Sequence, residues 1–234
     1  VIPSKDINIM LDLQHQDNLE TSLNEDALKR YIAYQCDHFF PDGYEINPAA
    51  WHEACRHALN RYAVCCREIQ VKYFQKNNKP AIHHLMSDQY AMFLYFMSHA
   101  LYKIDAETEA TKVYYLNKML HGIDVFFAVE LPDIFRFCHP TGTVLGRAEY
   151  ENYFVVFQNC TVGNNRGDYP VLEEAIAMYK GSMIAGQCTR GANSHISAHT
   201  FIRNENTWPD HVVFGKSPKL ETKPAGRSVK LAMF

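Results

Sequence analysis

Residues 172–207 divide without remainder into groups of six: LEEAIA, MYKGSM, IAGQCT, RGANSH, ISAHTF and IRNENT. The first residue of each group is apolar with one exception, the residues being Leu172, Met178, Ile184, Arg190, Ile196 and Ile202. Tyr150, Val156 and Val162 extend the same period upstream. A period of six fits neither the 3.6 residues of a helical turn nor the two-residue repeat of a strand. It fits a parallel β-helix in which three short strands form a triangular coil of about 18 residues, with the first positions pointing inward.

The alternative is a coincidental spacing of aliphatic residues in a mixed α/β domain. The hydrophobic periodicity before this region is different: apolar residues recur three and four positions apart, which is typical of amphipathic helices. We expect helices after Asn24, over 51–74, over 87–102 with Ser87 as N-cap, and over 106–121 with Gly122 at the C′ position. The fold class is therefore α+β: a helical domain over 1–122, a β-helix over 123–220 and a C-terminal tail over 221–234.

The composition excludes several classes of protein. The chain has 234 residues, 47% of them hydrophobic, and a net charge of −3, which argues against disorder and against non-specific nucleic-acid binding. The longest apolar run, 91–97, is far shorter than the ~18 residues that span a bilayer. The first residues show no charged region followed by an apolar one, so we expect no secretory signal in them. Seven cysteines without a C-x-x-C pair predict reduced thiols in a cytoplasmic protein.

Three stretches resemble the serine acetyltransferases, which are hexapeptide-repeat acyltransferases. They are HPTGTVLG at 139–146, the sixes after Leu172, and FGKSPKL at 214–220. The resemblance implies a left-handed parallel β-helix behind a helical domain, a homotrimer that associates further as a dimer of trimers through its helices, and direct acetyl transfer from acetyl-CoA to a small-molecule hydroxyl. From charge, apolar run length and histidine spacing we expect no nucleic-acid partner, no membrane insertion and no metal.

The same resemblance suggests site residues. It implies His139 as general base, with Asp124, slightly less than one coil upstream, fixing its tautomer. A chain that winds in coils passes close to the same point after nearly a full coil, so side-chain contact is reasonable. The positions that match a coenzyme A site are Asn164, Asn165, Lys180 and Ala198, to which Gly181 and Ser182 add close backbone approach and Lys216 and Lys219 add positive charge.

The sequence departs from the family where the acceptor would bind. The loop at 163–170 is shorter than in the family, and Tyr169 follows Asp168 where an Arg-His pair is usual. Arg166 is the candidate replacement for the lost guanidinium. Cys138 stands where the family has an aspartate before the histidine, and Asp88 is the candidate acceptor-binding carboxylate of the helical half.

Three functions stay open on the sequence. L-Serine is the first acceptor by resemblance. A sugar hydroxyl of a capsule, lipopolysaccharide or nucleotide-sugar precursor is the second, with Tyr150, Tyr153 and Phe157 as candidate stacking surfaces. The third is a non-catalytic β-helix scaffold. The pairs His83-His84 and His195/His199 invite a metal interpretation, but the register of the sixes separates the second pair, and we predict no metal site.

Overall fold

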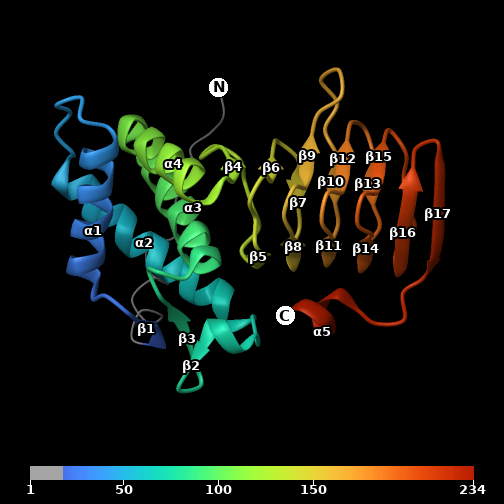
Figure 1. Cartoon of the computed structure of the whole chain (residues 1–234), viewed down its shortest axis with the longest axis horizontal. Helices are drawn as coiled ribbons and strands as arrows, with labels where there is room; N and C mark the ends of the chain where they lie inside the picture. The colour runs from blue at the N-terminus through green and yellow to red at the C-terminus, as the bar shows by residue number, and fades with distance from the viewer. Residues whose placement is uncertain (1–17) are drawn as a thin grey trace.

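The computed structural model describes residues 18–234 as a helical part and a β-helix lying end to end (Figure 1). The expectation of no secretory signal concerns residues 1–17, which lie outside the described residues. No helix in the described range is both long enough and apolar enough to cross a membrane. The β-helix is a left-handed parallel solenoid of about five coils; the sixes predicted a parallel β-helix, and the resemblance implied its left hand.

Four helices form the first part. They are α1 (Glu25–Phe39), α2 (Pro48–Arg67), α3 (Ser87–Lys103) and α4 (Glu107–His121). The side chain of Asn24 caps α1 and that of Asn47 caps α2. Helix α3 is buried on nearly every side because α2 and α4 both pack against it. Gly122 ends α4 in the left-handed region, with φ 64°, as predicted.

Two helix boundaries differ from the prediction. Helix α2 ends at Arg67 instead of continuing to residue 74, and the Gln75 side chain donates to the carbonyl oxygen of Cys66 in the last turn and to that of Ile69 just beyond the helix. Ser87 is the first residue of α3 rather than its cap; its hydroxyl lies 3.1 Å from Nδ1 of His121. Short elements that the periodicity did not predict fill the gap between α2 and α3, namely η3 (Lys72–Phe74), β2 (Gln75–Lys76) and β3 (Lys79–Ile82), the last pairing with β1 (Glu20–Thr21).

The strands of the β-helix form three faces. Face 1 consists of β4 (Asp124–Val125), β6 (Val144–Leu145), β9 (Thr161–Gly163), β12 (Met183–Ala185) and β15 (Phe201–Arg203). Face 2 consists of β7 (Glu149–Tyr150), β10 (Val171–Leu172) and β13 (Thr189–Arg190). Face 3 consists of β5 (Phe135–Phe137), β8 (Phe154–Val156), β11 (Ile176–Met178), β14 (Ser194–Ile196) and β16 (His211–Lys216).

The first positions of the sixes fill the prism, as predicted. Each of them from Leu172 to Ile202 is at most 1% exposed. Arg190 also points inward, and its guanidinium donates to the carbonyl oxygen of Glu205. The period of buried first positions is therefore unbroken at Arg190, although a charged residue stands there instead of an aliphatic one.

The length of a coil varies at two corners. Met183 pairs in register with Phe201 on one side and with Thr161 on the other, and the coil from Thr161 to Met183 is the longer of the two. This longer coil contains the protruding loop between β9 and β10 (Figure 1). The coil from Asp124 to Val144 is also longer than the one from Met183 to Phe201. Its extra length lies in the corner that contains His139.

The chain end closes the last coil and returns to the helices. Strand β17 (Lys219–Pro224) pairs antiparallel with β16. Helix α5 (Val229–Met233) then lies beneath the β-helix, pointing back toward the helical part (Figure 1). The Phe234 carbonyl accepts from the Gln70 amide at 2.5 Å, and Arg136 donates to the Met233 carbonyl at 2.8 Å. No sequence pattern indicated this return. All seven cysteines are free and buried.

Candidate active site on one edge of the β-helix

Each edge of the prism is a stack of corners between two faces. The face 3–face 1 edge stacks residues 138–143, 157–160, 179–182 and 197–200. The face 1–face 2 edge contains the loop 164–170, and the face 2–face 3 edge stacks 151–153, 173–175, 191–193 and 208–210. His139, Lys180, Gly181 and Ala198 therefore share one edge, as a site running along the prism requires.

His139 projects because its corner is widened. This corner runs from Phe137 to Val144 and holds more of the chain than the next corner, which runs from Val156 to Thr161. His139 has a φ of 51°, a left-handed conformation uncommon for a residue other than glycine. Its side chain is 78% exposed. The widened corner thus presents the imidazole to solvent.

Asp88 is the carboxylate beside this histidine. It lies in the first turn of α3 and its Oδ1 accepts from the backbone amide of His139 at 3.1 Å. Its Oδ2 lies 3.8 Å from Nδ1 of the ring, an ion-pair distance rather than a hydrogen bond. Cys138 lies next to both residues, and burial raises the pKa of its thiol. The structure thus brings together three candidates from the sequence, two from the β-helix and one from the helical part.

Asp124 has other partners. The Tyr114 hydroxyl donates to Oδ1 at 2.7 Å, and Lys118 Nζ donates to Oδ2 at 2.6 Å. Burial favours a higher pKa for Asp124, but the hydrogen bonds from Lys118 and Tyr114 outweigh it and keep the pKa below its usual value. Within residues 18–234 no hydrogen bond or ion pair joins Asp124 to His139, so the catalytic pairing of these two residues stays a prediction.

The edge beyond His139 is narrow and its corners are tight. Gly142 (φ 77°) and Gly181 (φ 69°) occupy equivalent corner positions in the left-handed region. A Cβ added at Gly181 would lie 2.7 Å from Nδ1 of His199, because that ring leans over the glycine. Lys180 and Ala198 are exposed beside it. A ligand lying along this edge would therefore contact the side chains of Lys180, Ala198 and His199.

The side chain of Ser182 does not belong to that surface. It is fully buried, with its hydroxyl 3.5 Å from Sγ of Cys160. It belongs to an interior column that fills the corner with small polar side chains, namely Thr143, Cys160, Ser182 and Thr200. Any contact of Ser182 with coenzyme A is therefore limited to its backbone, which is the contribution that the sequence predicted.

Lys216 lies at the far end of the same edge. Strand β16 pairs with β14 at Val212 and Val213 and with β15 at Lys216, so it crosses from face 3 to face 1. Lys219 pairs with Lys216 across the β16–β17 hairpin. Both lysines are exposed, and they add positive charge where the edge ends.

The loop 164–170 lies on a different edge. The backbones of Asn165 and Asp168 exchange hydrogen bonds at 3.0 and 3.2 Å, and Arg166 and Gly167 between them both have positive φ, as in a type I′ turn. Arg166 is thus exposed at the tip, while the guanidinium of Arg147 covers the ring of Tyr169 at 5.5 Å. Within one chain these residues and Asn164 belong to the face 1–face 2 edge, not to that of His139.

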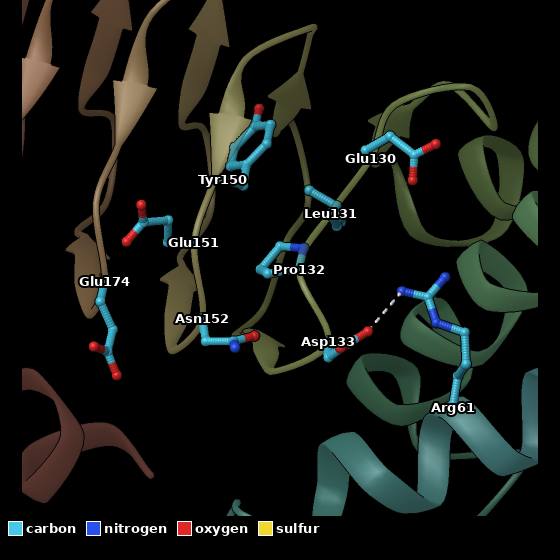
Figure 2. Close-up of a pocket in the computed structure, with 9 residues that line it drawn as sticks. All are labelled: Arg61, Glu130, Leu131, Pro132, Asp133, Tyr150, Glu151, Asn152 and Glu174. Atoms are coloured by element: carbon cyan, nitrogen blue, oxygen red, sulfur yellow. Dashed lines mark ion pairs between the residues drawn. The ribbon is translucent and has the colours of Figure 1, made fainter. Parts of the chain in front are cut away.

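A pocket of about 610 Å³ lies on the third edge, between α2 and the β-helix (Figure 2). Its charged side chains are four carboxylates and one guanidinium: Glu130, Asp133, Glu151, Glu174 and Arg61. Arg61 points toward Asp133 at 3.7 Å (Figure 2). A cavity with a net negative lining repels phosphate groups, so it is a poor site for coenzyme A.

The histidine pairs singled out in the sequence form no metal cluster in the described part of the chain. His83 and His84 stack on each other, with ring centroids 5.2 Å apart. His195 is buried, with Nδ1 3.2 Å from the Tyr179 hydroxyl and Nε2 2.9 Å from the Arg227 carbonyl. The metal-capable group in the described range is instead Asp88, Cys138 and His139. Sequence reasoning named each of these residues but missed that they meet; the adjacency of Cys138 and His139 was the available signal.

Comparisons with known proteins agree with this architecture. A Vibrio cholerae serine acetyltransferase structure superposes with a TM-score of 0.66 at 16% identity, covering 88% of this chain and 81% of that one. The fold is that of the serine acetyltransferases. A Brucella abortus serine acetyltransferase in complex with coenzyme A has a TM-score of 0.62, again at 16% identity, and covers 88% and 84% of the two chains.

The similarity in sequence covers less of the chain than the similarity in structure does. A Schizosaccharomyces pombe protein named "Putative serine acetyltransferase" is 24% identical over 140 residues, which are 58% of this chain and 51% of that protein. The chain thus spans about half the length of this curated relative. No protein-family profile matches the present chain. Each of these two structural matches covers 88% of this chain, which is more than either the helical part or the β-helix alone.

Proposed function

We propose that this protein is an acetyl-CoA-dependent O-acetyltransferase that transfers the acetyl group directly to an acceptor hydroxyl. The observation that carries the proposal is the exposed His139 imidazole with a carboxylate at 3.8 Å, on an edge whose other charged groups are lysines. The similarity to serine acetyltransferases in sequence and fold supports the same reaction class.

His139 acts as the general base in this proposal. Nδ1 faces Asp88, which leaves Nε2 directed toward an acceptor. Nε2 takes the hydroxyl proton as the acceptor oxygen attacks the thioester carbonyl, and the proton then passes to the sulfur of the departing thiolate. A carboxylate on the other nitrogen stabilises the imidazolium that forms in between. No covalent enzyme intermediate is needed.

Asp88 is the carboxylate that we assign to this positioning role. The resemblance suggests Asp124, but both oxygens of Asp124 already accept from Tyr114 and Lys118. Asp88→Asn and Asp124→Asn form a matched pair of variants. We expect Asp88→Asn to lower kcat by about tenfold or more and to shift the acidic limb of the pH–rate profile, because the imidazolium loses its partner. If only Asp124→Asn does so, the dyad of the resemblance is correct and our assignment fails.

Coenzyme A lies along the face 3–face 1 edge in this proposal. Successive coils are ~4.8 Å apart, so the edge rises roughly 19 Å over the four coils from His139 to Lys216. Ala198 is small and allows a close approach of the pantetheine chain, whereas at Gly181 the ring of His199 lies over the glycine and would have to turn aside. Lys180, Lys216 and Lys219 attract the phosphates. Asn164 and Asn165 would contribute only from the face 1–face 2 edge of a neighbouring subunit.

L-Serine is the acceptor that we propose. The aromatic residues considered for a sugar are engaged elsewhere: Tyr150 is buried, Tyr153 lies under Lys230, and Phe157 stacks on Tyr179. A carboxylate in the acceptor requires a cation, and Arg166 at the exposed loop tip is the candidate, with Asp168 and Tyr169 beside it. Turnover with a sugar but not with serine would reject this choice of acceptor.

A homotrimer is the assembly that we propose. Arg166 and His139 lie on different edges of one chain, so a shared acceptor site needs the loop of one subunit at the histidine of the next. Association of trimers through the helices and a cytoplasmic location are further expectations. Light scattering at micromolar concentration is expected to give a mass of three chains, and a monomeric mass would contradict the shared site.

Calorimetric titration with coenzyme A separates an enzyme from a scaffold. We expect binding to the wild-type chain, weakened several-fold by Lys216→Glu because the phosphates lose a cation. Absence of binding would favour the scaffold function over the transferase.

A further inference from the structure

The group of Asp88, Cys138 and His139 has the composition of a metal site. Each residue offers one ligand atom, and the three atoms lie within 4.8 Å of one another. Zinc binds sulfur at about 2.3 Å and nitrogen or oxygen at about 2.0–2.1 Å, so tetrahedral ligands lie roughly 3.3–3.8 Å apart. A closing movement of roughly 1 Å is therefore enough.

The chain holds two of the three donors firmly and leaves the third adjustable. The amide of Cys138 donates to the Val156 carbonyl at 2.9 Å in the coil, and the thiol is buried. Asp88 is held in the first turn of α3 by its contact with the amide of His139. The 78% exposed ring of His139 is free to rotate toward the other two. Its left-handed backbone makes the sharp turn that lets consecutive residues face one ion.

The type of donor selects the ion. A thiolate and an imidazole favour a borderline-soft cation such as Zn²⁺ and disfavour Mg²⁺ and Ca²⁺, which prefer all-oxygen sets. Three protein ligands leave the fourth tetrahedral position open to water.

We propose that Asp88, Cys138 and His139 bind a thiophilic divalent cation, Zn²⁺ in first place, and that its binding blocks His139 as a base. The Cys138 thiol releases its proton to solvent when it binds the metal. A neutral imidazole has one lone-pair nitrogen, so a metal on Nδ1 leaves Nε2 carrying the hydrogen. Nε2 then has no lone pair with which to accept the acceptor proton. This inhibitory consequence rests on the proposed function, whereas the metal binding itself does not.

Co²⁺ titration of the full chain under reducing conditions tests the site without any activity assay. We expect one equivalent to give a thiolate-to-cobalt charge-transfer band and the visible bands of tetrahedral Co²⁺, both displaced by Zn²⁺. Cys138→Ser is expected to abolish the charge-transfer band and Asp88→Asn to weaken binding by about tenfold. Cys188→Ser, a buried thiol on the face 1–face 2 edge, is the matched control and keeps both signals.

The outcomes are separable. A wild-type chain without the band, or a band unchanged in Cys138→Ser, overturns the proposal. Asp88→Asn decides the question if Cys138→Ser does not fold, since Asn has the size of Asp and the side chain at this position is 20% exposed. Zn²⁺ binding as expected in a protein without transferase activity would leave the site standing and reject the proposed function. Activity that Zn²⁺ does not inhibit, in a protein that binds the ion, would reject the blocking of His139.

Discussion

Two edges of the same prism differ sharply in chemistry although their backbones repeat. The corners of the face 3–face 1 edge present His139, Lys180 and His199 and hold no carboxylate of their own, so the one acid at His139, Asp88, comes from α3. The described corners of the face 2–face 3 edge present Glu151, Glu173, Glu174 and Asp210 and no cation. The first has a widened corner; the second lines an acidic pocket (Figure 2).

The comparison shows how a repeating fold acquires one site. Inward-facing positions are constrained alike in every coil, because each must fill the prism. The exposed corner residues do not fill the prism and are free to differ. An anionic co-substrate discriminates between the two edges by charge alone.

Removal of the His139 imidazole is the largest expected effect. His139→Ala is expected to lower kcat for acetyl transfer by about 10²–10⁴-fold, because general-base catalysis is lost. Steady-state thiol release from acetyl-CoA measures it, with circular dichroism to check the fold. His38→Ala, an exposed histidine of α1, is the control. Equal rates in the two variants would mean that His139 is not the general base and that the face 3–face 1 edge is not the catalytic one.

The buried interior of the prism supports both edges. Ile184→Ala is expected to destabilise the chain by about 2–5 kcal/mol, because a fully buried side chain of the prism is cut back to a methyl group. Denaturant unfolding followed by circular dichroism measures the change. A loss below about 1 kcal/mol would mean that the coil collapses around the gap, and the interior would then be less constrained than we infer.

The junction behind His139 predicts a pH dependence of stability. Burial lowers the pKa of His121 to about 4, from the usual 6.5, so the unfolded chain takes up this proton first as the pH falls. The stabilising contribution is full above pH 6.5 and is lost between about 6.5 and 4, amounting to roughly 3 kcal/mol at most. His121→Gln is expected to flatten the pH dependence of the free energy of unfolding in this window. An unchanged slope would show that His121 is not buried as a neutral ring.

Reversal of one charge on an edge is the change with the smallest expected effect. It tests whether acetyl-CoA binds to the face 3–face 1 edge in preference to the acidic edge. Lys180→Glu is expected to raise KM for acetyl-CoA several-fold without changing kcat, and added salt should reduce the difference. Glu174→Lys, on the acidic edge of the same coil, is the matched variant and should leave KM unchanged. Equal effects of the two changes would argue for a ligand that spans both edges.

The interior of the β-helix was more predictable from the sequence than its surface. The period of six correctly predicted that the aliphatic first positions from Leu172 to Ile202 are buried, and Arg190, the exception in the pattern, is buried as well because prism geometry repeats regardless of residue type. Gly122 likewise indicated the end of α4 correctly. The partner of His139 was not predictable, since Asp88 is distant in the sequence and meets it only through packing of α3 on the coil. The C-terminal return through α5 left no periodic signal at all.

Acceptor-dependent release of the coenzyme A thiol from acetyl-CoA tests the central claim most directly. The wild-type chain is assayed with L-serine and then with a panel of sugars and nucleotide sugars, and the acetylated product is identified by mass spectrometry. We predict turnover with L-serine and its loss in His139→Ala. Thiol release that no acceptor stimulates, or that survives the loss of His139, would contradict the proposed transferase.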